Sequence, residues 1–288
     1  MDHVVDTSCL RKPELTNALE SAAPGDRFVL ADTAVLETMK NAQWESTARS
    51  SFQIIAQHPQ KIWLAKAPGD LLRAELATGQ ETQDVIDVPM SEGFRSLLQE
   101  IASSVDGPAM AHARSNVTAA QTTLAQQQQN HTVNFQGLNL AFDDIRSSID
   151  IAGYRRIADP KQKELVRLHR IKTLAQASVR RLVELEGGPA ALGNALANGH
   201  GILLRFQIGY YSLGFKWAVN NGLDSFPAER ATNEIMDLDH ALIATYFDAI
   251  LTREVSVREL RHEILDVLNS NVQFAPAAAE AWLKSPNP

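Results

Sequence analysis

The sequence contains a single cysteine, Cys9, among its 288 residues. One thiol excludes a disulfide within the chain and argues against a cysteine-rich zinc site. Because Cys9 follows a short apolar segment, we interpret it as a small core residue and not as a nucleophile. The chain also lacks any apolar run of about 18 residues, so no membrane span is expected.

Several other signals are missing. The N-terminus shows no signal-peptide pattern, which makes the cytoplasm the expected compartment. There is no G-x-x-x-x-G-K-[ST] phosphate loop and no G-x-S-x-G nucleophile motif. The eight histidines do not form a ligand pair at helical spacing, and we interpret His240 as a surface residue or a hydrogen-bond donor.

The composition is that of a globular chain, with 44% apolar and 21% charged residues. The length suits one large domain or two small ones and can support a sizeable core. The net charge of −7 argues mildly against a general nucleic-acid binder, although a net figure hides local patches.

Short β-prone segments alternate with helical patterns near both ends of the chain, which is typical of an α/β fold with a parallel sheet. The first expected strand runs through Val4 and Val5 and delivers Asp6 to its tip. Further strands are expected at Arg27–Leu30, Lys61–Ala65, Asp248–Thr252 and Val272–Ala275. The apolar segment Val85–Val88 has no assignment from the sequence.

Apolar residues at helical spacing predict the helices between these strands. Asp32 and Thr33 are N-cap candidates for a helix that we expect to continue through Trp44. The remaining helices are expected at residues 12–23, 48–57, 71–76, 91–102, 237–247 and 257–268.

The middle of the chain has a different character. Residues 107–140 are small and polar, which is typical of a solvated helix or a linker, or else of a polar arm that touches a partner. From 142 to 220 the pattern is helical throughout. We therefore expect an α/β core made of residues 1–66 and 231–288, with a mostly helical insertion at 67–230.

Basic residues are concentrated in one segment of this insertion, residues 154–181, which holds nine of the chain's 27 lysines and arginines. A solvated helix face and a phosphate-binding surface are both compatible with this segment. The candidates for nucleic-acid binding are Arg155, Arg156, Lys163, Arg167, Arg170 and Lys172. The later helix around Tyr210 is rich in aromatic residues, which favours core packing, although it could also serve an interface in a homo-oligomer.

Acidic residues recur where expected strands end or the following helices begin. Asp6 ends a strand, Glu37 lies in the first turns of a helix, and Glu254 follows a strand. Asp237 and Asp239 open a late helix, and the spacing to the strand end slightly favours Asp237 as the ligand. In a parallel sheet all these positions lie at one edge, so they can face one crevice.

The pattern resembles the PIN-domain nucleases. The matching segments are Val4–Ser8, Leu30–Glu37 and Asp237–Glu254, and the last reproduces the family's helix, its strand and its Thr-Arg-acid ending. The resemblance extends over about a third of the chain, in two blocks. The sequence departs from the family in its long insertion and in Glu254, where the family more often has Asp.

The resemblance implies a three-layer α/β/α fold with a short central parallel sheet, and an endoribonuclease that uses Mg²⁺ or Mn²⁺. It implies Asp6, Glu37, Asp237 or Asp239, and Glu254 as metal ligands and catalytic residues. Thr7, Ser8 and Thr252 would give hydrogen bonds to these carboxylates. Clustered carboxylates without a cation should have raised pKa values.

The biological setting stays open at this level. A toxin or defence effector with an inhibitory protein partner, and an RNA-processing enzyme, both fit the resemblance. A non-catalytic PIN-like module that binds RNA or protein is the main alternative. A helical regulatory or scaffold protein, whose acids are only helix caps and surface charges, is the other.

Overall fold

The computed structural model describes residues 1–129, 131–220 and 228–270. Within these residues the chain is mostly helical with one small sheet, and it divides into two compact units. The first unit consists of residues 1–71, 84–130 and 239–259. The second unit consists of residues 72–83, 131–238 and those from 260 onward.

A four-stranded parallel sheet forms the centre of the first unit. Its strands lie in the order β3-β2-β1-β4, and Val4 of β1 pairs with Val29 of β2 and Ile250 of β4. The bounds are Asp2–Val5 for β1, Arg27–Leu30 for β2, Ile62–Leu64 for β3 and Ala249–Leu251 for β4. The expected short parallel sheet is therefore confirmed, and the strand expected at 272–275 lies outside the described residues.

The strands form where the sequence is apolar without interruption. Val4, Val5, Phe28 and Val29 have no exposed surface, as expected for parallel strands covered on both faces. On the far side of β3, Ala65 pairs antiparallel with Ile86. The segment that the sequence left unassigned thus protects one edge of the sheet.

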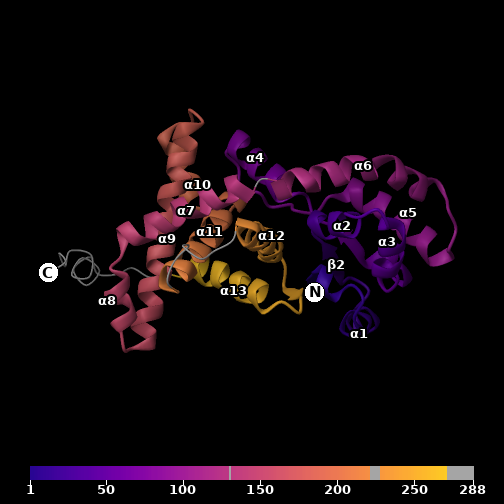
Figure 1. Cartoon of the computed structure of the whole chain (residues 1–288), viewed down its shortest axis with the longest axis horizontal. Coiled ribbons are helices and arrows are strands. Elements are labelled where there is room, and N and C mark those ends of the chain that lie inside the picture. The colour runs from indigo at the N-terminus through magenta and orange to yellow at the C-terminus, as the bar shows by residue number, and fades with distance from the viewer. Residues whose placement is uncertain (130, 221–227, 271–288) are drawn as a thin grey trace. The chain divides into compact units, whose positions relative to one another are not determined.

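Helices surround the sheet in the first unit (Figure 1). The expected continuous helix from Asp32 to Trp44 is wrong, because the chain turns after Thr38. At Met39 the backbone leaves the helical conformation, and its N–H donates to the carbonyl of Leu36. The unit contains α1 (Pro13–Ser21), α2 (Asp32–Thr38), α3 (Trp44–Phe52), α5 (Val88–Ser103), α6 (Pro108–Gln129) and three short 3-10 turns, Thr7–Cys9, Ile55–Gln57 and Pro59–Lys61.

The helices α5 and α6 belong with the sheet, although the sequence suggested an insertion beginning at residue 67. Phe94 of α5 packs edge-on against Phe52 of α3, with ring centroids 5.2 Å apart. Met110 of α6 is fully buried in the same hydrophobic cluster. These apolar contacts make α5 and α6 part of the core of the first unit.

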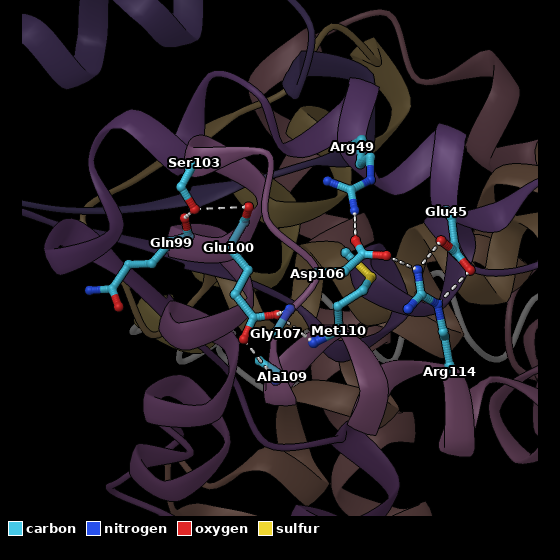
Figure 2. A network of polar contacts seen from close by, with 10 residues as sticks. All are labelled: Glu45, Arg49, Gln99, Glu100, Ser103, Asp106, Gly107, Ala109, Met110 and Arg114. Atoms are coloured by element: carbon cyan, nitrogen blue, oxygen red, sulfur yellow. Dashed lines mark hydrogen bonds and ion pairs between the residues drawn. The ribbon is translucent and has the colours of Figure 1, made fainter.

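A polar network fixes the start of α6 (Figure 2). Arg114 forms ion pairs with Glu45 of α3 and with Asp106, and Asp106 also pairs with Arg49 of α3. Glu100 accepts hydrogen bonds from three backbone N–H groups at the beginning of α6, those of Gly107, Ala109 and Met110. An acid at a helix N-terminus satisfies donors that have no partner within the helix.

The second unit is helical. Its long helix α11 buries Ile208, Phe215 and Trp217, so the interpretation of the aromatic segment as core is confirmed. Gly214 lets α11 approach α7, because a Cβ atom there would meet Ala141 at 3.2 Å. The unit contains α7 (His131–Ser148), α8 (Ile151–Arg156), α9 (Pro160–Leu185), α10 (Ala190–Asn198), α11 (Ile202–Val219), and the larger parts of α12 (Ala228–Ala244) and α13 (Val255–Asn269).

Glu75 anchors the start of α11. It lies near the end of α4 (Pro68–Thr78) and is 1% exposed. Its carboxylate accepts the N–H groups of Ile202 and Leu203 at 2.9 and 3.0 Å, and that of Thr82 at 3.0 Å. A buried carboxylate is costly unless it is fully hydrogen-bonded, and here three donors and the helix dipole compensate its charge.

Candidate active site

Asp6 lies at the carboxyl end of the central strand β1. Its backbone N–H donates to the carbonyl of Leu251, which ends β4, so the chain stays in the sheet up to this residue. The side chain is 4% exposed. The expectation that β1 delivers this acid to its tip is therefore confirmed.

Three hydroxyl groups hold the Asp6 carboxylate. Thr7 Oγ1 donates to Oδ1 at 3.2 Å, and Ser8 Oγ and Thr252 Oγ1 both donate to Oδ2 at 2.6 Å. Thr252 follows β4 and accepts the backbone N–H of Glu254 at 3.0 Å. An ionised carboxylate accepts hydrogen bonds only, so these donors fix the orientation of a charged Asp6.

His240 connects the end of α12 to this edge of the sheet. Its side chain is 4% exposed, and Nε2 lies 3.2 Å from the hydroxyl of Thr33, the second residue of α2. Its Nδ1 lies 3.8 Å from Asp6 Oδ1 and has no hydrogen-bond partner among the described residues. Of the two interpretations of His240, the surface residue is wrong, because the residue is buried, whereas a hydrogen-bonding role agrees with the contact to Thr33.

Asp32 and Asp239 form a second acidic pair in the first unit. Asp32 begins α2, separated from the end of β2 by one residue, and Asp239 precedes His240 in α12. Burial raises the pKa of Asp239 to about 7, and the negative charge of Asp32 adds to the shift. Burial also raises the pKa of Asp32, opposed by hydrogen bonds from the backbone and by the neighbouring His240.

The structure places the other expected acids less centrally. Glu37 is half-buried in the last turn of α2, and Glu254 is exposed just before α13. Asp237 belongs to the second unit, whereas Asp239 belongs to the unit that holds Asp6. Of the two late aspartates, Asp239 is thus the one that shares a unit with Asp6, although the spacing slightly favoured Asp237.

Asp32 is the acid that sequence reasoning missed. It was interpreted as an N-cap candidate, but the N-cap of α2 is Ala31, and Asp32 lies inside the first turn. One oxygen of its carboxylate, Oδ1, is buried without a hydrogen-bond partner among the described residues. The signal was present, because Asp32 follows β2 as Asp6 follows β1.

The acidic side chains at this edge of the sheet are the candidate ligands for a divalent cation. Across the ranges 1–129, 131–220 and 228–270, no group of three or more His, Cys, Asp or Glu side chains is arranged to hold a metal ion. Mg²⁺ is often bound by only one or two carboxylates, with water and substrate phosphates completing its shell. The Asp32–Asp239 pair fits that arrangement, because the charge of Asp32 contributes to the raised pKa of Asp239 and one carboxylate oxygen of Asp32 lacks a hydrogen-bond partner among the described residues.

The basic residues of α8 and α9 are largely engaged within the second unit. Arg155 Nε donates to the carbonyl of Val219 at 3.1 Å, and Lys172 Nζ donates to that of Ser270 at 2.7 Å. Arg167 pairs with Glu164 and Glu263. Arg156 lies 3.8 Å from Asp150, Lys163 lies over the ring of Tyr154, and burial lowers the pKa of Arg170.

Comparison with protein-family models, with curated proteins and with solved structures finds no match for this chain. Among the helices of the described residues, none is long and apolar enough to cross a membrane.

Proposed function

We propose that this chain is a metal-dependent endoribonuclease of PIN-like type, which hydrolyses RNA phosphodiester bonds with Mg²⁺ or Mn²⁺. The observation that carries the proposal is the group of aspartates at the carboxyl edge of a parallel sheet. Asp6 follows β1, Asp32 follows β2, and Asp239 is brought to Asp32 by α12. Ligands of open α/β sheets bind at this edge.

Each residue has a distinct role in this proposal. Asp32 and Asp239 hold the cation, which relieves their repulsion. Asp6, fixed by three hydroxyl donors, orients the attacking water. A bound Mg²⁺ or Mn²⁺ supplies an activated water and neutralises charge on the phosphate. Glu37 and Glu254 complete the site as further carboxylates.

The test compares the wild type with Asp239→Asn on a short labelled RNA in the presence of Mn²⁺. We expect cleavage to fall by about 100-fold or more, because the variant loses a charged ligand. Removing a repelled charge should leave the fold at least as stable, so lost activity cannot be attributed to misfolding. Asp143→Asn, an exposed change on α7, is the matched control.

The outcomes separate the candidate functions. Equal cleavage by the wild type and Asp239→Asn would contradict the catalytic site. If the wild type binds the RNA but does not cut it with either metal, the non-catalytic binding module is correct. If the wild type neither binds nor cuts the RNA, the acids are structural, and the regulatory or scaffold function gains support.

A further inference from the structure

Most cations of the first unit are already committed to partners within it. Their side chains form ion pairs or donate to carbonyl and hydroxyl oxygens, or stack on an aromatic ring. This holds for Arg11, Arg27, Arg49, Lys61, Lys66, Arg95 and Arg114. A polyanionic substrate at an acidic edge needs a cation that is still available, because phosphate and carboxylates repel each other.

Arg253 is such a cation at the edge itself. It is exposed, and no hydrogen bond or ion pair joins its guanidinium to a residue in the described ranges. Its backbone N–H donates to Ser8 Oγ at 3.1 Å, and Ser8 Oγ donates to Asp6 Oδ2. The Arg253 backbone is therefore fixed two hydrogen bonds away from the Asp6 carboxylate.

The backbone holds Arg253 at the carboxyl end of β1. Thr252, the residue before it, donates to Asp6 Oδ2 at 2.6 Å, and Glu254, the residue after it, donates its backbone N–H to Thr252 Oγ1 at 3.0 Å. The residues on both sides of Arg253 are therefore linked by hydrogen bonds to the Asp6 carboxylate.

We propose that Arg253 binds the phosphate next to the cleaved bond of the RNA, through its guanidinium and the non-bridging phosphate oxygens. This inference rests on the proposed function and adds a substrate contact to it. Arginine suits the task because its planar fork presents two parallel N–H donors to a phosphate. The hydrogen bond from the Arg253 N–H to Ser8, and that from Ser8 to Asp6, connect the phosphate contact to the orientation of Asp6.

The experiment measures KM, kcat and the salt dependence of KM on a fluorescein-labelled single-stranded RNA with Mn²⁺. Arg253→Gln should raise KM about tenfold and lower the salt slope by about one counterion. Arg253→Lys should recover part of the affinity, because it keeps the charge and loses the fork. Arg258→Gln, an exposed arginine one turn into α13, should behave as the wild type.

Binding gives a second readout that does not depend on turnover. Fluorescence anisotropy of the same RNA, with Mn²⁺ and the Asp239→Asn background, should show the same ranking of the Arg253 variants. If the wild type cleaves and Arg253→Gln keeps its KM, Kd and salt slope, the Arg253 contact is wrong while the proposed function stands. If the wild type neither binds nor cleaves RNA, both are overturned.

Discussion

Two aspartates at the same edge of the sheet, Asp6 and Asp239, have different surroundings. Asp6 receives three hydroxyl donors, which fix the orientation of its carboxylate. Asp239 is half-buried and faces the charge of Asp32, so its neutral form is favoured and its pKa rises to about 7. Perturbed acids in such pairs are typical of functional sites, although structural ion clusters also produce them.

The raised pKa of Asp239 predicts a pH dependence of stability. Its ordinary pKa is 3.8, so between about pH 4 and 7 the folded state binds more protons than the unfolded state. Its contribution to stability is therefore present below pH 4 and is lost as the pH rises through 7. Asp239→Asn should raise the free energy of unfolding at pH 8 by on the order of 2 kcal/mol and change it little at pH 4. Urea denaturation at both pH values measures this, and an Asp143→Asn control should show no such difference.

Elements were predictable from the sequence where their pattern was local. Continuous apolar segments placed β1 and β2 correctly, because buried parallel strands need nothing else. The helix after Asp32 was extended too far, since the backbone break at Met39 has no marker in the apolar pattern. The role of His240 could not be predicted, because its contact with Thr33 joins residues 207 positions apart in the sequence.

In the basic helix α9, too, a contact between residues distant in sequence could not be predicted from the local pattern. Its charge density suggested a nucleic-acid surface, but the structure gives Lys172 a partner in the second unit. Its ammonium group donates to the carbonyls of Leu268 and Ser270, at the end of α13. A cation at a helix C-terminus satisfies carbonyls without partners and opposes the helix dipole. The RNA-binding prediction for α8 and α9 stays a prediction, and it can be tested at this residue.

Lys172→Met should lower stability and leave RNA binding unchanged. We expect a loss of about 1 kcal/mol, because two carbonyls lose a charged donor. Thermal unfolding measures the loss of stability, and the KM for RNA measures whether RNA binding is unchanged. Lys161→Met, an exposed change at the start of the same helix, is the control. A rise in KM for Lys172→Met with normal stability would show that α9 contacts the substrate instead.

At the scale of the whole molecule, two separate cores divide the chain. The core of the first unit gathers Leu15, Phe28 and Phe52 around the sheet. The second unit buries α11 among the helices α7, α9 and α10. Each unit is assembled from segments that are distant in sequence, which is why a simple insertion between two halves of a core did not describe the boundaries.

Separate cores predict that damage stays within its own unit. Leu15→Ala leaves a cavity in the first core and should cost about 3 kcal/mol. Glu75→Gln should cost about 2 kcal/mol in the second unit, because the amide places N–H groups against the N–H donors of α11. Hydrogen exchange read by mass spectrometry should show faster exchange in β2 for Leu15→Ala and in α11 for Glu75→Gln. Faster exchange of both elements in both variants would show instead that the two units unfold as one. The control is Glu184→Gln, an exposed change in α9, which should alter the exchange of neither β2 nor α11.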